Sequence, residues 1–222
     1  MKLPFGKSFV AVTVAAMALF MLFPGLDLTV SGLFYRDGAF YLRDNAVVRF
    51  LYEYGELPAE ITAAAALLLF VAAAASRRSA LLGCRRRVWL YLFLAAIIGP
   101  GLIVNTALKD HLGRARPLQI QEFGGDRQFT VALAPADQCP RNCSFPCGHC
   151  AAGFYFLSIG FVATGRARRA ALAAGLLWGA ALSSARLVQG GHFLSDAVFA
   201  LIIVYAVSAV LHWLMFRVDD II

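Results

Sequence analysis

A cation, an imidazole and a carboxylate stand close together near the carboxyl-terminal end of the sequence, as Arg186, His192 and Asp196. They lie between two apolar runs, and charged groups at a membrane boundary are costly enough that they usually serve a function. If the second run is helical, His192 and Asp196 share one face, where the carboxylate can orient the imidazole as a base or nucleophile. Gly190 and Gly191 would leave the outer side of His192 open. The alternative is a structural ion pair between Arg186 and Asp196 beside an interfacial histidine, and this stretch alone favours neither.

Two further cations begin the longest polar segment of the chain, residues 109–148. Lys109 and Arg116 are separated by about two helical turns, so they face the same way if the preceding helix continues. No matching carboxylate is evident, and the pair suits an anion such as phosphate, with lysine as a point charge and arginine as a planar fork. Anchoring to lipid headgroups is the alternative.

A second histidine follows the sequence Ser144-Phe145-Pro146-Cys147-Gly148. Proline favours the first helical position and an apolar run comes next, so Pro146 predicts that His149 lies in the opening turn of a helix. The free N–H groups of Cys147, Gly148 and His149 would then form an anion-binding helix terminus. Gly148 would let a phosphate approach closely.

The composition predicts an integral membrane protein. Hydrophobic residues make up 60% of the chain and charged residues 15%, and the mean hydropathy is +0.71, whereas a soluble domain is about half apolar and a quarter charged. The 222 residues suit one domain over 1–222, an all-α bundle of about six spans. The net charge of +7 does not indicate a nucleic-acid binder, because the basic residues form short clusters between apolar runs.

Six apolar runs are expected to cross the membrane. They cover residues 9–23, 59–76, 88–108, 150–164, 170–185 and 193–216. We interpret the first as a retained span, because no small-x-small cleavage site follows it. The third should bend at Pro100. Aromatic residues crowd the segment 27–58, which predicts one or two short interfacial helices, with an ordinary packed loop as the alternative.

The charge clusters predict an orientation with the amino terminus inside, because short cytoplasmic loops carry the excess of basic residues. This orientation places the following residues in the cytoplasm: Lys2, Lys7, Arg77, Arg78, Arg85, Arg86, Arg87, Arg166, Arg168, Arg169 and Arg217. The polar segments 109–148 and 186–192 then meet on the outer, periplasmic side. A bundle with its polar segments on one face predicts an enzyme or receptor that faces outward.

The three segments together resemble the type 2 phosphatidic acid phosphatase (PAP2) superfamily. The resemblance rests on the order Lys-x6-Arg-Pro at 109–117, Pro-x-Gly-His at 146–149 and Arg-x5-His-x3-Asp at 186–196, and on the six-span layout. It implies that His192 is a nucleophile forming a phosphohistidine, that Asp196 orients it, and that His149 is the general acid. It also implies no cofactor and no metal. The implied phosphate ligands are Lys109, Arg116, Cys147, Gly148 and Arg186.

The resemblance implies a lipid phosphatase of the bacterial inner membrane, similar to the lipid A phosphatases, with its active site facing the periplasm. The partners implied are a lipid phosphate and the membrane. Undecaprenyl pyrophosphate or phosphatidylglycerophosphate phosphatases, a lipid phosphotransferase and a non-catalytic lipid-phosphate binder remain alternatives. The sequence leaves the lipid and the oligomeric state open.

The cysteines depart from the family pattern and allow several interpretations. Cys147 stands where the family usually has serine, and a thiol is a weaker hydrogen-bond donor, so we expect weaker phosphate binding. Cys147 acting as a nucleophilic thiolate, or zinc binding by Cys139, Cys143, Cys147 and Cys150 together with His149, are the less favoured alternatives. A disulfide between Cys139 and Cys143 on the outer face is the preferred interpretation.

Overall fold

The computed structural model describes residues 4–75 and 80–216. Of the predicted cytoplasmic cations, Lys2, Arg77, Arg78 and Arg217 lie outside these ranges, as does the last residue of the expected span 59–76. The described elements are α1 (Lys7–Leu22), α2 (Gly25–Gly32), β1 (Tyr35–Arg36), β2 (Ala39–Phe40), α3 (Ala46–Tyr54), α4 (Leu57–Ala75), α5 (Ala80–Ala96), the π-helix η1 (Ile97–Leu108), the short 3-10 helices η2 (Pro117–Gln119) and η3 (Gln121–Phe123), α6 (Gly148–Phe154), α7 (Leu157–Val162), α8 (Gly165–Val188) and α9 (Leu194–Phe216).

The bundle is mostly helical, as predicted, and the six expected spans are not confirmed. Within residues 4–75 and 80–216, four helices are long and apolar enough to cross a membrane: Ala46–Ala75, Arg86–Leu108, Gly165–Val188 and Leu194–Phe216. A fifth span is possible if α1 and α2, which meet at 81°, count as one. The predicted span 150–164 corresponds to the apolar helical stretch Gly148–Val162, which is too short for a core of about 30 Å at 1.5 Å per residue.

Pro100 lies inside a π-helix, and the span Arg86–Leu108 continues through it. Proline has no N–H to donate and its ring disturbs the preceding turn. The wider helix persists to its end, where the Lys109 N–H donates to the Val104 carbonyl at 3.1 Å. The expected irregularity at Pro100 is therefore a widened helix rather than a break in the span.

A small β-hairpin was missed by the all-α prediction. Strands β1 and β2 pair antiparallel, with Tyr35 opposite Phe40. Asp37 and Gly38, with φ of 51° and 81°, form the turn, and positive φ at both central residues is the geometry that Asp-Gly favours. The segment 27–58, expected to hold one or two surface helices, thus contains this hairpin as well as parts of α2 and α4 and the whole of α3.

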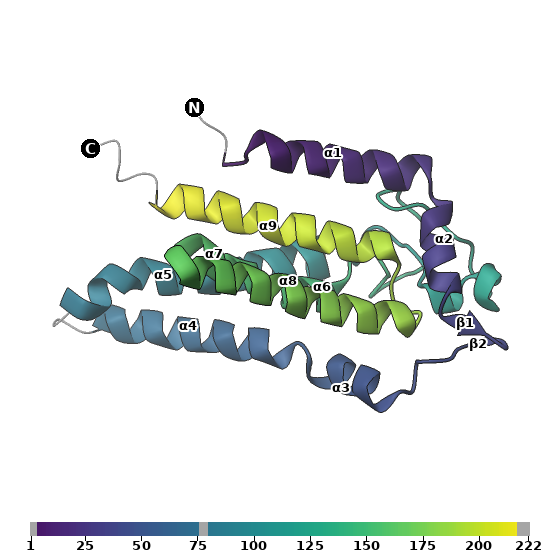
Figure 1. Cartoon of the computed structure of the whole chain (residues 1–222), viewed down its shortest axis with the longest axis horizontal. Coiled ribbons are helices and arrows are strands. Elements are labelled where there is room, and N and C mark those ends of the chain that lie inside the picture. Colours follow the sequence, from purple (N-terminus) through teal and green to yellow (C-terminus); the bar gives the residue numbers. More distant parts are fainter. Residues whose placement is uncertain (1–3, 76–79, 217–222) are drawn as a thin grey trace.

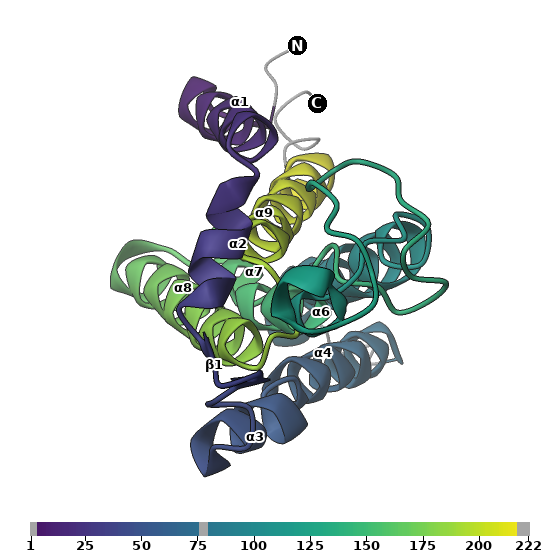
Figure 2. The ribbon, with the colours of Figure 1, turned by 90° about the vertical axis from the view of Figure 1, so that its right-hand side faces the viewer.

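The polar segments meet at one end of the bundle (Figure 1). The start of α1, the end of α4, the starts of α5 and α8 and the end of α9 lie at the opposite end. In the end-on view, α2 crosses over the ends of the long helices, and the segment between η1 and α6 lies over α6 (Figure 2). The basic residues at the start of α8 are therefore at the far end from the polar segments.

Helix α6 lies very close to α8 because glycines line their contact. A Cβ added to Gly153 would stand 2.7 Å from the Gly179 Cα, and one added to Gly179 would stand 2.0 Å from the Phe154 ring. Small residues of this kind let helix backbones approach closely. The contact fixes the helix that carries His149 against the helix that carries Arg186.

Arg114 ties the segments of the polar end together. Its side chain is 1% exposed. Nη2 donates to Asp27 of α2 at 2.8 Å and Nη1 donates to Asp196 of α9 at 2.6 Å. Nε donates to the Thr130 carbonyl at 2.9 Å. The guanidinium also lies over the Phe193 ring, 4.2 Å from its centroid. A single buried cation therefore joins α2, the long loop and the start of α9.

We expect Arg114→Met to lower the free energy of unfolding by about 3–5 kcal/mol, because it leaves two buried carboxylates without their cation. Thermal unfolding of the purified protein in detergent measures this as a lower Tm. Arg127→Met is the matched control, since Arg127 is exposed and pairs with the exposed Asp126 at 3.5 Å, a pair that contributes about 0–1 kcal/mol. Equal Tm values for the two variants would contradict this role of Arg114.

Candidate active site

His192 is buried beside Asp196, as the sequence predicted, but the helix α9 begins only after it, at Leu194. Its Nδ1 lies 3.4 Å from Asp196 Oδ2, and it makes no hydrogen bond to any residue in the described ranges. Asp196 Oδ2 accepts from the Phe193 N–H at 2.8 Å and from the Ser144 hydroxyl. The carboxylate is thus fixed by its neighbours, with one oxygen facing the imidazole.

The sequence predicted that Gly190 and Gly191 would leave the outer side of His192 open. The structure shows other residues packed against both glycines. Gly190 has φ +66°, and a Cβ there would stand 2.4 Å from the Phe40 ring. A Cβ on Gly191 would stand 2.3 Å from Nη2 of Arg186. The glycines instead make room for the hairpin and for the guanidinium of Arg186.

His149 lies in the first turn of α6, as predicted, and both of its ring nitrogens face oxygen atoms. Nδ1 lies 3.2 Å from Glu56 Oε1 and Nε2 lies 3.1 Å from the Tyr52 carbonyl oxygen. The Tyr52 ring stacks on the imidazole with centroids 5.0 Å apart. Trp178 of α8 donates to the Gly55 carbonyl at 3.2 Å, which holds the α3–α4 junction that bears Glu56.

Arg186 is buried in the last turn of α8 with part of its guanidinium unsatisfied. It donates to the Gln189 side chain through Nη1 and stacks over the Tyr52 ring at 4.4 Å. Its buried Nε has no hydrogen-bond partner among the described residues. Buried polar groups are usually satisfied, so this donor is available to an anion. Tyr52 therefore contacts both the imidazole of His149 and the guanidinium of Arg186.

Lys109 and Arg116 are not on one helical face, in contrast to the prediction. The helix ends at Leu108, and Arg116 has an extended backbone with φ −83° and ψ 156°. The positive φ of 63° at Gly113 is incompatible with a continuing helix. Arg116 donates through Nη2 to the carbonyl and side-chain oxygens of Asn142 at 2.9 and 3.1 Å. The loop nevertheless places the two cations close enough to interact, because the charge of Arg116 lowers the pKa of Lys109.

Helix α6 starts at Gly148, so Pro146 precedes the N-cap, Cys147, and is not the first helical residue. The Cys147 N–H is not free either, because it donates to the Asp196 carbonyl at 3.3 Å. Gly148 lies against Asn105, whose Oδ1 would be 2.3 Å from an added Cβ. Of the three predicted anion-binding amides, only those of Gly148 and His149 remain at the start of the helix.

The four cysteines between residues 139 and 150 form two disulfides, one of which was expected. Cys139 pairs with Cys143, as predicted, and Cys147 pairs with Cys150. The proposal that Cys147 donates a thiol hydrogen bond to phosphate, or acts as a thiolate, is wrong in this structure because its sulfur is bonded. The four sulfurs that the zinc alternative required are paired in the two disulfides. No group of three or more potential ligands within residues 4–75 and 80–216 is arranged to hold a metal ion.

The electrostatics of the site keep both imidazoles neutral. Burial lowers the pKa of His192 to about 3, and the charges of Arg186 and Lys109 act in the same direction. Burial, Arg186, Lys109 and Arg116 lower the pKa of His149 to about 4. Burial and the charge of Arg116 lower the pKa of Lys109 to about 8. Three cations therefore lie within electrostatic reach of one or both histidines.

The sequence analysis did not identify the residues that support the site. Glu56 and Tyr52 lie in the aromatic segment before the second span, and Asp27 lies near the start of α2. Each is far in sequence from its partner, so no spacing pattern could connect them. Arg114 had a weak signal, as a cation inside the first motif. Asp27 is 1% exposed, and this burial can be seen only in the folded structure.

Residues 87–220 match the PAP2 superfamily. A lipid A 4'-phosphatase of Francisella tularensis subsp. novicida (strain U112) is 33% identical over 205 residues, covering 91% of each chain. A lipid A 4'-phosphatase of Rhizobium leguminosarum is 35% identical over 201 residues, covering 83% of this chain and 84% of the relative. No solved structure matches the chain. The family match and the two relatives agree with the three motifs, and the chain belongs to the PAP2 superfamily.

Proposed function

We propose that this protein is a bacterial membrane phosphatase that removes a phosphate group from a lipid A-type glycolipid. The relatives that bear this activity in their names cover most of the chain. The observation that carries the proposal is the set of Lys109, Arg116 and Arg186, whose charges act on His149, with Lys109 and Arg186 also acting on His192. This is an arrangement for a phosphate next to two imidazoles.

In the proposed reaction, His192 attacks phosphorus and the bond to the lipid oxygen breaks. Nδ1 faces Asp196, so Nε2 is the attacking atom and a phosphohistidine forms. His149 gives a proton to the leaving oxygen and then takes one from the water that hydrolyses the intermediate. Asp196 stabilises the positive ring of His192, while the three cations neutralise the charge on the phosphoryl oxygens.

Binding of phosphate would also prepare His149 to act as an acid. The cations that lower its pKa are neutralised by the incoming dianion, so its pKa rises when substrate is present. The Glu56 carboxylate, 3.2 Å from Nδ1, acts in the same direction and leaves Nε2 for the lipid oxygen. For this transfer, Nε2 must exchange the Tyr52 carbonyl for the substrate.

A lipid substrate is favoured by an apolar cavity bordered by Glu56, the carboxylate that contacts His149. The cavity has a volume of about 450 Å³ and lies between α4, the α5–η1 helix and α6. Leu67, Phe93 and Ile97 are among the apolar residues that line it. Arg166, Arg168 and Arg169, at the start of α8, lie at the far end of the bundle (Figure 1), and the positive-inside bias supports our proposal that the site faces the periplasm from the inner membrane.

We expect His192→Ala to abolish phosphate release, with a loss of at least about 10³-fold in kcat, because no other side chain supplies the phosphoryl acceptor. Phosphate release from purified lipid A in detergent measures it. His111→Ala is the control, since His111 is an exposed histidine of the polar segment 109–148 and should keep normal activity. Full turnover by the His192 variant would refute the mechanism.

Activity should fall as the pH rises through about 8, the pKa of buried Lys109. A lowered lysine pKa means that the ammonium is present below about 8 and is lost above it. The alkaline limb should appear in kcat/KM, which reports on the free enzyme. Lys109→Arg should move this limb upward, because arginine keeps its charge. An unchanged limb in that variant would assign the titration to another group.

Glu56→Gln should lower kcat for lipid A by about tenfold with little change in KM, because the acid loses the carboxylate that supports its protonated form. A p-nitrophenyl phosphate substrate, whose leaving group needs no proton, should be affected much less. Glu122→Gln is the control, because Glu122 is an exposed glutamate of η3 that does not line the cavity. Equal losses on both substrates would indicate a structural role for Glu56 instead.

A further inference from the structure

Two neighbouring cavities beside the site share three of their lining residues, and together they are called the groove. The first, of about 240 Å³, is lined by Arg43, Asp44, Arg49, Tyr52, Glu53, Arg116, Leu118, Arg186, Gln189 and Gly191. The second, of about 230 Å³, includes Tyr35, Phe40 and Phe123 from the hairpin region. Both are lined by Arg43, Asp44 and Leu118. The groove therefore runs from Arg186 past the residues before α3 to the hairpin.

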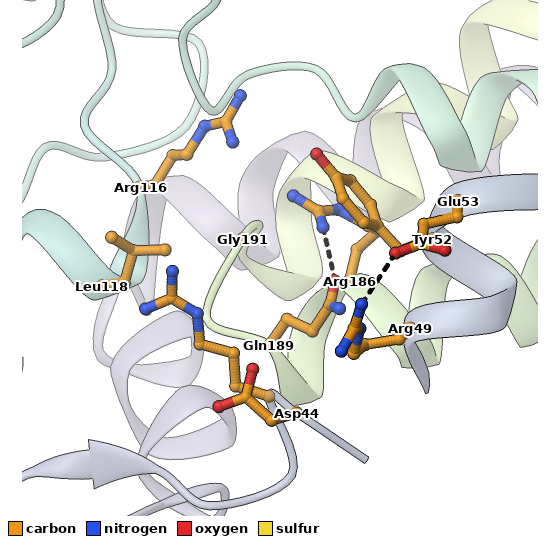
Figure 3. Close-up of a pocket in the computed structure, with 10 residues that line it drawn as sticks. Asp44, Arg49, Tyr52, Glu53, Arg116, Leu118, Arg186, Gln189 and Gly191 are labelled. Atoms are coloured by element: carbon orange, nitrogen blue, oxygen red, sulfur yellow. Dashed lines mark hydrogen bonds and ion pairs between the residues drawn. The ribbon is translucent and has the colours of Figure 1, made fainter. Parts of the chain in front are cut away.

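One end of this groove coincides with the proposed phosphate ligands. Arg116 and Arg186 both line the first cavity and lie on either side of Gly191, with Gln189 bonded to Arg186 (Figure 3). A phosphate held by these two arginines would have its remaining substituent directed either toward the apolar cavity or along this groove. A group that occupies the groove is thus joined closely to the reacting phosphate.

The outer part of the groove has balanced charge. Arg49 pairs with Glu53 at 3.3 Å, and Arg43 stands next to Asp44 at the junction of the cavities. These two cations and two carboxylates cancel, in contrast to the inner end, where Arg116 and Arg186 are in excess. A second phosphate would be repelled by Asp44 and Glu53, whereas hydroxyl groups can donate to the carboxylates and accept from the guanidiniums.

The far end of the groove is aromatic and rigid. Tyr35, Phe40 and Phe123 contact one another, with ring centroids 5.2–5.5 Å apart. Phe40 is 6% exposed and lies against Gly190, which fixes the hairpin to the loop that leads to His192. Aromatic rings offer an apolar face with a polar rim, and Tyr35 adds a hydroxyl. Such a surface suits the C–H face of a pyranose ring.

We propose that this groove binds the sugar of a phosphorylated glycolipid, with Arg43 and Asp44 as the residues that select it. The inference rests on the proposed phosphatase function and adds the part of the head group that is recognised. Arg43 and Asp44 bind ring hydroxyls, and the hairpin aromatics cover an apolar sugar face. Lipids whose phosphate is joined to glycerol leave the groove empty and gain nothing from these contacts.

The test compares Arg43→Ala and Asp44→Asn on two substrates, a monophosphorylated lipid A and phosphatidic acid. We expect kcat/KM for lipid A to fall about tenfold, equivalent to about 1.4 kcal/mol of binding, through KM. Turnover of phosphatidic acid should stay within about twofold, and it shows in the same preparation that the variant is folded. Arg36→Ala and Asp37→Asn are matched controls on the hairpin, because neither residue lines the groove.

Three results would overturn the assignment. Equal losses on both substrates would mean that Arg43 and Asp44 act on the phosphate site in general, and unchanged lipid A kinetics would mean that the groove is not used. A loss confined to bisphosphorylated lipid A would show that Arg43 binds a second phosphate and not the sugar. Failure of the phosphatase proposal is distinguishable, since the unmodified protein would then release phosphate from neither substrate.

Discussion

The buried guanidinium of Arg114 is the constraint on which the polar end of this protein depends. It is 1% exposed and bonded to two carboxylates that are 2% exposed or less. Such a cluster is costly to desolvate and is tolerated only when every member is paired. Because Asp27 belongs to α2 and Asp196 to α9, the cluster forces α2, α9 and the long loop to meet at one place. His192 is positioned by the carboxylate that Arg114 holds.

The proposed catalytic arrangement depends on the difference between the neutralised Arg114 cluster and the cations near His192. Arg114 has its two carboxylates, whereas Arg186 has a buried Nε with no partner in the described part of the chain. Burial lowers the pKa of His192 to about 3, and the positive charges of Arg186 and Lys109 act in the same direction. A neutral imidazole next to unmatched cations is suited to attack a phosphate dianion, since the anion supplies the missing charge.

The surroundings of His149 separate the proposed lipid tail from the proposed head group. Glu56, in contact with His149, borders the apolar cavity between α4 and α6. Tyr52, stacked on the same imidazole, borders the polar groove. A phosphate bound here would lie between a hydrocarbon-compatible space and a space lined by arginine, carboxylate and aromatic side chains. That division matches an amphipathic substrate, whose two parts differ in the same way.

The sequence by itself determined the membrane class, the three motifs and the roles expected of His192, Asp196 and Arg186, because hydropathy and short spacings are local properties. It also indicated the Cys139–Cys143 disulfide, whose partners lie one short loop apart. Only the tertiary structure decided that Gly148–Val162 is too short for a full span, that Cys147 is bonded to Cys150, and that Glu56 and Arg114 support the two histidines. These last contacts join residues that are distant in sequence. A charged side chain needs an oppositely charged partner only when it is buried, and these side chains become buried only when the helices pack.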